Sequence, residues 1–256
     1  MSNINKGKTT SRRSFLRVAL AGGAGAVVAN SAPAQSGDPL ITEIQPWAQE
    51  LGDGVDVVRY GMPIEHEGDI VRRNVGWLTA DTISSVNFTP IHGLDGTITP
   101  QGCAFERHHS GAIDLRKEDY RLMVNGIVDT PLIFTYSDLE RFPRENHIYF
   151  CECAANSGME WAGAQLNGAQ FTHGMIHNME YTGVSLRTIL NEAGLISAGD
   201  LKDKWIFVEG ADASSNGRSI PMEKALDDVL VAFKANGEAL RKEHGYPVRL
   251  VVPGWE

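Results

Sequence analysis

Apolar residues in the second half of the chain fall into short runs that predict strands. The run His147-Ile148-Tyr149-Phe150 is aromatic and β-branched and is bounded by small polar residues. This composition predicts a buried strand, with Cys153 at its C-terminal end. The same pattern predicts another buried strand at residues 205–208 and further strands at residues 120–124, 132–134, 229–233 and 248–252. Asn125-Gly126 and Asn236-Gly237 are dipeptides typical of turns between strands.

Two short helices interrupt these strands. Residues 137–142 predict a helix with Ser137 as N-cap and Glu140 completing a capping box. Residues 185–190 predict a second helix that ends at Gly194. Its buried stripe is expected to comprise Leu186, Ile189 and Leu190.

The domain organisation follows from where these periodic runs occur. Residues 35–102 are rich in Gly, Asp, Pro and Thr, which predicts an extended, wrapping segment with one short strand around Ile98. Residues 103–256 predict one mixed α+β domain. The chain ends directly after the apolar run 248–252, so the domain is expected to be cut at its C-terminal end.

The N-terminus predicts the compartment. Residues 11–17 (SRRSFLR) match the twin-arginine export pattern, an apolar Gly/Ala-rich region follows, and Ala32-Pro33-Ala34 is a small-residue cleavage site. Residues 1–34 are therefore expected to be a twin-arginine signal peptide of a periplasmic protein, since the apolar region is shorter than the ~20 residues that span a bilayer. A membrane-anchoring helix is the alternative. Export by this route favours a protein that folds around a cofactor in the cytoplasm.

Charge and cysteine usage narrow the class of function. The formal net charge of −9 argues against nucleic acid as a partner, and we expect no membrane partner. Cys103, Cys151 and Cys153 are an odd number of thiols, and two cysteines separated by one residue rarely form a good disulfide. In an oxidising compartment, the free thiols of an exported protein persist only if they are buried or bound to a ligand. A bond to a metal keeps the cysteine sulfur in its thiolate form. Inert burial as small hydrophobic side chains is the alternative.

Four motifs, taken together, resemble the sulfite oxidase family of molybdenum enzymes from about Ala104 to the end of the chain. They are the sequences FERHH at 105–109, CAAN at 153–156, EGAD at 209–212 and HGYPVRLVVPG at 244–254. The chain is most similar to the sulfane dehydrogenase branch of that family, in the Sox sulfur-oxidation pathway. The resemblance implies an α+β, sulfite-oxidase-type molybdopterin-binding fold with mixed sheets and short helices. It also implies a C-terminal immunoglobulin-like dimerisation domain, which lies beyond the end of this sequence.

The resemblance assigns a role to six residues. The molybdenum ligand falls on Cys153 and the substrate-anion arginine on Arg107, while the pterin-binding positions fall on His109, Asp212, His244 and Arg249. A soft thiolate suits a high-valent metal, and arginine with histidine suits a phosphate group. Taken singly, these residues have plainer interpretations: a solvent-facing strand charge for Arg249, a loop histidine for His244, and a turn former for Asp212.

The resemblance further implies molybdenum-dependent oxidation of protein-bound sulfane sulfur, with electrons passed to a c-type cytochrome. The cofactor would be molybdenum-molybdopterin, with haem only on a partner subunit. The expected partners are a c-type cytochrome subunit and a sulfur carrier protein, in an oligomer when the protein is full length. Direct sulfite dehydrogenase activity is one alternative. A non-catalytic fragment that binds a cofactor or a partner is another.

Three features depart from this pattern or add to it. Sulfite-oxidising relatives carry consecutive arginines where this chain has Ser157 and Gly158, which favours a sulfur species on a carrier over free sulfite. The family's catalytic tyrosine, in an Arg-Asp-Tyr-Lys stretch, lies beyond the end of the sequence, so this chain alone is not expected to turn over. His173 and His177 are spaced to share a helix face, as a metal pair would be, but no third ligand completes the pattern.

Overall fold

The computed structural model describes residues 48–49, 51–55, 57–79, 83–195, 201–212 and 214–255. The predicted signal peptide at 1–34 lies outside these residues, so its assignment stays a prediction. Residues 57–256 form one compact unit, to which the following description refers. No helix in the described part of the chain is long and apolar enough to cross a membrane.

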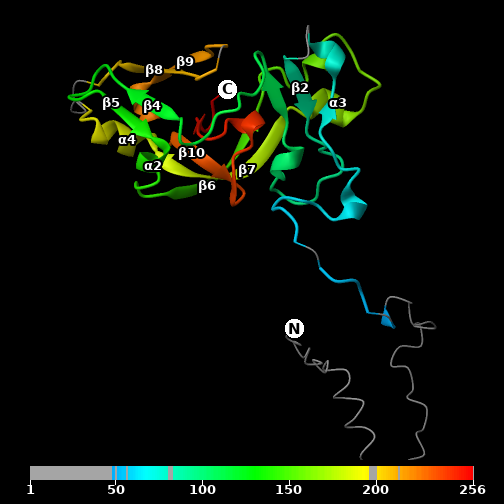
Figure 1. Ribbon diagram of the computed structural model, residues 1–256. Coiled ribbons are helices and arrows are strands. Elements are labelled where there is room, and N and C mark those ends of the chain that lie inside the picture. Colours follow the sequence, from blue (N-terminus) through cyan, green and yellow to red (C-terminus); the bar gives the residue numbers. More distant parts are fainter. Residues whose placement is uncertain are drawn as a thin grey trace, which may run out of the picture. The chain divides into compact units, whose positions relative to one another are not determined.

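A five-stranded antiparallel sheet lies at the centre of this unit (Figure 1). β10 is hydrogen-bonded to β7 along one edge and to β11 and β12 along the other, and β6 continues the sheet beyond β7. The register places Cys151 opposite His177, and Ala232 opposite Arg249. The five strands are β6 (Glu145–Glu152), β7 (Ile176–Ser185), β10 (Leu230–Ala235), β11 (Glu238–Ala239) and β12 (Arg249–Val251).

Two hydrophobic cores cover the two faces of β10. Val231 and Phe233 belong to the larger core, whereas Leu230 and Ala232 belong to a smaller one on the opposite face. Alternate residues of a strand point to opposite faces, so an unbroken apolar strand has to be buried on both. The strand predicted at 229–233 is confirmed, as is the turn at Asn236-Gly237.

Two other strands are exposed on one face, contrary to the prediction that they are buried. In β6, Ile148 is 57% and Phe150 61% exposed, and in β8 (Trp205–Glu209) Trp205 is 58% and Phe207 65% exposed. β6 is an edge strand of the sheet, and β8 forms a two-stranded ribbon with β9 (Gly217–Pro221). An aromatic and β-branched run predicts extended backbone, but it does not determine whether other elements cover both faces.

The predicted helices form, one of them at a shifted position. α4 (Leu186–Glu192) follows Ser185 and buries the expected stripe, and so confirms the prediction. α2 (Tyr136–Leu139) is capped by Thr135 and not by Ser137. The Thr135 hydroxyl accepts from the Asp138 N–H at 3.2 Å, and the Asp138 carboxylate accepts from the Thr135 N–H at 2.9 Å. This pair closes the reciprocal capping box two residues earlier than Ser137 and Glu140 would.

The N-terminal part of the unit forms a second sheet. β1 (Arg73–Asn74), β2 (Ser85–Phe88) and β3 (Glu106–His108) are antiparallel neighbours, and α3 (Ala169–His173) packs beside them. The strand predicted around Ile98 is wrong. Residues 85–88 form a strand of this sheet instead. Thr99, next to Ile98, donates its N–H to the Asn178 carbonyl of β7 at 2.7 Å.

The remaining elements complete the expected α+β architecture with short helices. Residues 121–135 form the predicted hairpin, in which Gly126 has a positive φ of 101°. The elements are β4 (Arg121–Val124), β5 (Leu132–Thr135), β8 (Trp205–Glu209), β9 (Gly217–Pro221) and α5 (Met222–Ala225), with 3₁₀ turns η2 (Glu65–Glu67), η3 (Gly76–Leu78), η4 (Gln101–Cys103), η5 (Gly158–Glu160) and η7 (Lys242–His244).

Substitutions on the two faces of the β6–β7 pair should differ in cost. Met179→Ala removes a fully buried side chain and should lower the free energy of unfolding by about 2–5 kcal/mol. Phe150→Thr alters a largely exposed position and should change it by less than about 0.5 kcal/mol. Urea unfolding of the two variants measures both values, and an equal loss for Phe150→Thr would contradict the edge-strand description.

Candidate functional site

The loop that carries Cys153 begins where β6 ends and is locked in place by one asparagine. The Cys153 N–H donates to the Met175 carbonyl at 3.0 Å, and its side chain packs against the core that contains Phe105. The side-chain oxygen Oδ1 of Asn156 accepts from the Met175 N–H at 3.0 Å, and its side-chain amide donates to the Glu152 carboxylate at 3.0 Å. The asparagine of the CAAN sequence therefore fixes the backbone that presents the thiol.

The two residues after Asn156 leave space beside this loop. Ser157 has a positive φ of 62° and donates its N–H to the Thr172 carbonyl at 2.9 Å. A Cβ added at Gly158 would meet only the Trp161 ring, at 3.8 Å, which is ordinary van der Waals contact. Trp161 itself is 78% exposed. A larger side chain at Gly158 would therefore fit without rebuilding the loop.

β3 alternates between inward and outward side chains. Glu106 is buried and accepts from the Ser85 hydroxyl at 2.8 Å, and His108 lies 3.3 Å from the same carboxylate. Arg107 and His109 are exposed. The Arg107 guanidinium donates to the Ser85 carbonyl at 3.3 Å, so it is oriented along the sheet at a surface that a dissolved anion can reach.

The turn between η7 and β12 directs His244 and Arg249 into the protein. Gly245 has a φ of 93°, and a Cβ there would lie 3.1 Å from the Cβ of Arg249, so the close approach favours glycine. The His244 Nε2 lies 3.1 Å from the Phe105 carbonyl, and the Arg249 Nη2 donates to the Cys151 Sγ at 3.6 Å. His244 is only 2% exposed. The interpretations of Arg249 as a solvent-facing charge and His244 as an ordinary loop histidine are therefore excluded.

These side chains belong to a polar cluster on the inner face of the central sheet. The histidine–arginine cluster comprises Cys151, His177, Tyr181, His244 and Arg249. The His177 Nε2 lies 3.0 Å from the Tyr181 hydroxyl, and the rings of His177 and His244 are 5.8 Å apart in a T-shaped arrangement. The Phe105 ring lies 4.9 Å from His177, so Phe105 contacts both histidines.

Burial and the charge of Arg249 keep both imidazoles neutral. Burial, followed by repulsion from Arg249, lowers the pKa of His177 to about 2 and the pKa of His244 to about 4. Burial also raises the pKa of Tyr181, so its hydroxyl keeps its proton. The Nδ1 atoms of His177 and His244 are buried and have no hydrogen-bond partner in the described part of the chain. Unpaired buried polar atoms of this kind are costly and call for an explanation.

Phe105 connects most of the predicted site residues. It directly precedes β3, which contains Arg107 and is followed by His109. Its carbonyl contacts His244, and its core cluster includes Cys153. Contacts between β3 and η7, among them His108 Nε2 with the Glu243 carbonyl at 3.1 Å, hold these elements together. The structure therefore brings Arg107, His109, Cys153 and His244 close to one residue in the chain or in the core, and Arg249 joins them through its contact with Cys151.

Asp212 lies in a different setting, in the loop between β8 and β9. Its carboxylate accepts from the Ser214 hydroxyl at 2.6 Å, and its carbonyl accepts from the Ser215 N–H at 3.2 Å. These bonds form a local turn, which fits the plainer interpretation of Asp212. Its assignment to pterin binding stays a prediction.

The histidine pair noted in the sequence does not share a helix. α3 ends at His173, whereas His177 lies in strand β7, so the expected common face is wrong. No group of three or more His, Cys, Asp or Glu residues that could hold a metal occurs among the residues described. The sequence pattern missed the relevant feature of His177, which is that His177, Met179 and Tyr181 alternate onto the buried face of β7.

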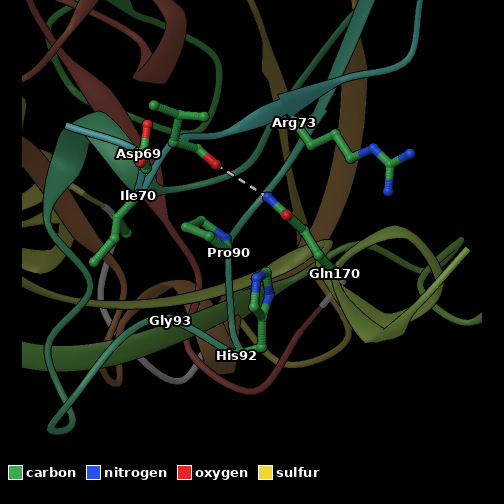
Figure 2. Close-up of a pocket in the computed structure, with 8 residues that line it drawn as sticks. Asp69, Ile70, Arg73, Pro90, His92, Gly93 and Gln170 are labelled. Atoms are coloured by element: carbon green, nitrogen blue, oxygen red, sulfur yellow. Dashed lines mark hydrogen bonds between the residues drawn. The ribbon is translucent and has the colours of Figure 1, made fainter. Parts of the chain in front are cut away.

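A separate hollow opens beside β1 and α3, away from these residues (Figure 2). Its volume is about 310 Å³, and its lining includes Asp69, Ile70, Arg73, Pro90, His92 and Gln170. Gln170 donates to the Val71 carbonyl at 3.0 Å across its edge. The guanidinium of Arg73 already donates to the Asn167 carbonyl and lies over the Phe171 ring. None of the predicted site residues lines this hollow.

Comparison with known proteins connects the geometry to a family. The profile described as "Oxidoreductase molybdopterin binding domain" matches residues 109–256. Mitochondrial sulfite oxidase of Mus musculus is 32% identical over 169 residues, which cover 62% of this chain and 31% of that protein. Nitrate reductase [NADH] 1 of Phaseolus vulgaris is 33% identical over 170 residues, which cover 62% of this chain and 19% of that protein.

A solved structure is more similar. The crystal structure of the sulfane dehydrogenase SoxCD from Paracoccus pantotrophus matches with 67% identity and a TM-score of 0.77, over 86% of this chain and 56% of that chain. The chain thus spans about a third of the sulfite oxidase and little more than half of the matched SoxCD chain.

The depressed pKa of His244 predicts a pH dependence of stability. In the unfolded chain the His244 imidazole has its ordinary pKa of about 6.5, so below that pH it binds a proton that the native imidazole does not bind until about pH 4. The free energy of unfolding should therefore fall as the pH drops from about 6.5 towards 4. One such group adds a slope of up to about 1.4 kcal/mol per pH unit. His244→Gln, whose amide can keep the bond to Phe105, should flatten this slope in urea unfolding from pH 4 to 8. The exposed His66→Gln is the control, and an unchanged slope in His244→Gln would contradict the assignment.

Proposed function

The chain belongs to the family of oxidoreductase molybdopterin-binding domains, and we propose that it is the molybdenum-binding part of an enzyme that oxidises sulfur compounds. The observation that carries this proposal is the 67% identity to the sulfane dehydrogenase SoxCD over 86% of this chain. The fold supports the same conclusion, since the TM-score of 0.77 extends the similarity to the arrangement of the elements.

The residues of the site fit molybdopterin. We assign Cys153 as the thiolate ligand of molybdenum, and His109, Asp212, His244 and Arg249 as residues that hold the pterin. Two buried imidazole nitrogens without partners, beside a guanidinium, need a polar ligand to complete their hydrogen bonds. When bound, the molybdenum cofactor would supply the two-electron oxidation of sulfur.

In this proposal, residues of the chain itself hold the Cys153 sulfur in place and bind the anionic substrate. Asn156 fixes the loop, so the Cys153 sulfur is held at the end of β6. Arg107 lies at the surface of β3 and serves as the clamp for an anionic sulfur group, since a guanidinium pairs with oxyanions through two N–H groups. Arg249 supplies a fixed positive charge behind the site, and burial keeps its two histidine neighbours neutral.

The partners follow from the proposed reaction. We propose that electrons pass to a c-type cytochrome subunit that carries the haem, and that a sulfur carrier protein delivers the substrate, in an oligomeric, periplasmic enzyme. The matched SoxCD structure supports a partner subunit, and the twin-arginine pattern at residues 11–17 supports export.

Sulfane sulfur on a carrier is the proposed substrate, because the loop after Cys153 offers space where sulfite-oxidising relatives carry arginines. Free sulfite is a small dianion that needs several cations in a confined pocket. Gly158 supplies no charge, and the space beside it would admit a carrier's cysteine arm. Direct oxidation of sulfite is the second candidate, favoured by the 32% identity to mitochondrial sulfite oxidase.

Cys153→Ser should change how molybdenum is bound. The full-length protein, produced in a host that makes molybdopterin, should lose most of its molybdenum or one sulfur ligand in X-ray absorption spectra. Cys103→Ser is the matched control, because Cys103 is also half-buried but belongs to η4 and contacts the Ile70 carbonyl. Identical molybdenum coordination in wild type and Cys153→Ser would reject Cys153 as the ligand.

Gly158→Arg should shift the substrate preference towards free sulfite. A charge-assisted contact contributes about 1.5–3 kcal/mol, so kcat/KM for sulfite should rise roughly tenfold or more in the full-length enzyme. Gly158→Gln adds similar bulk without charge and should leave this value low. Steady-state rates with sulfite and with a persulfidated carrier test both variants. A wild-type enzyme that prefers free sulfite would instead support the second candidate.

A further inference from the structure

His177 occupies a position that the proposed function does not yet use. It is 3% exposed, lies opposite Cys151 in the β6–β7 register, and sits within the histidine–arginine cluster. Its Nε2 is paired with the Tyr181 hydroxyl, but its Nδ1 is buried and has no partner among the residues that the structure describes. The His244 Nδ1 is likewise buried and unpaired within the described residues, and the centroids of the two rings are 5.8 Å apart. A native core contains few unpaired buried groups, so two side by side indicate a missing ligand.

The hydrogen-bond partners determine which nitrogen carries the proton in each ring. The Phe105 carbonyl can only accept, so His244 must carry its proton on Nε2, and its Nδ1 is then an acceptor. The Tyr181 hydroxyl is buried, and its neighbouring acceptor is the His177 Nε2 at 3.0 Å. If the hydroxyl donates to that nitrogen, the His177 proton lies on Nδ1, which is then a donor. The cluster therefore presents one donor and one acceptor next to each other.

A ligand that satisfies both atoms must itself offer an acceptor and a donor. A phosphate ester at neutral pH offers chiefly acceptors and would leave the His244 Nδ1 unpaired. The pyrimidinone ring of a pterin carries a carbonyl next to an N–H and so matches the pair. Arg249, assigned above to pterin binding, belongs to the same cluster through its contact with Cys151.

We infer that His177 is a further residue of the cofactor site, and that its Nδ1 donates a hydrogen bond to the amide-like edge of bound molybdopterin beside the His244 Nδ1. This inference rests on the proposed function, because it takes the bound group to be molybdopterin. It assigns His177 to cofactor binding, in place of the metal pairing with His173 that the sequence spacing indicated.

Two substitutions separate this role from a structural one. Asparagine places a polar atom where the histidine Nδ1 lies, whereas glutamine places one where Nε2 lies. His177→Asn should therefore keep the contact with the cofactor and lose the contact with Tyr181, and His177→Gln should do the reverse. Both variants lose the ring contact with Phe105 equally, so they control for each other. Met179→Leu, next on the same buried face of β7, controls for general disturbance of the strand.

The readout is the rate at which pterin leaves the purified, full-length holoenzyme, measured by fluorescence after oxidation, with molybdenum per protein from elemental analysis. His177→Gln should release pterin about tenfold faster than wild type, the factor that one hydrogen bond of ordinary strength contributes. His177→Asn and Met179→Leu should stay within about threefold of wild type. Thermal unfolding followed by circular dichroism checks that each variant is folded.

The alternative outcomes are distinct. Faster release from His177→Asn with a normal rate for His177→Gln would show that His177 acts through Tyr181, and would overturn the inference. Wild-type rates in both variants would overturn it as well, and would indicate that a water molecule bridges the two histidines. A wild-type protein without pterin, from a host that loads another molybdenum enzyme normally, would instead reject the proposed function itself.

Discussion

The pairing of β10 on both edges and its burial on both faces is the constraint on which the rest of this structure depends. Val231 and Phe233 close the larger core on one face, and Leu230 and Ala232 close the smaller core on the other. Because paired residues of a sheet share a face, the register of Ala232 with Arg249 turns that arginine inward. β10 therefore stabilises the unit and also determines that the charged Arg249 side chain points inward, beneath the candidate site.

The inward arginine determines the chemistry of its neighbours. A guanidinium stays charged at any physiological pH, so nearby groups adjust their protonation to it. Burial and this charge hold His177 and His244 neutral, and within the described part of the chain each ring has one nitrogen without a partner. The cluster thus combines a fixed cation with neutral donors and acceptors, a combination suited to a large polar ligand and unsuited to a purely structural core.

The thiol of Cys153 is positioned by a backbone hydrogen bond to Met175 and by packing of its side chain against the core that contains Phe105. β6 ends at Glu152, and Asn156 ties the following loop to Met175 of the neighbouring chain segment. The loop then passes Gly158, where added atoms would meet only the ring of an exposed tryptophan. A fixed thiol next to open space suits the proposed delivery of the substrate on another protein, because the proposed metal ligand stays in place while the approach to it stays wide.

The sequence by itself determined much of the local structure and the family of this protein. The stripe of α4, the Asn236-Gly237 turn and the position of Cys153 at a strand end follow from short-range patterns, and the combined motifs indicated a molybdopterin-binding domain. Only the tertiary structure decided which faces are covered, because burial depends on distant elements: Phe150 lies exposed on an edge strand, although its own residues favour a buried one. The same holds for His177, whose neighbours in the cluster come from β6, η7 and β12 and are 26 or more positions away in the sequence, apart from Tyr181 on its own strand. Local spacing paired it with His173, whereas the antiparallel register placed it opposite Cys151, and the packing of η7 and β12 brought His244 and Arg249 close to it.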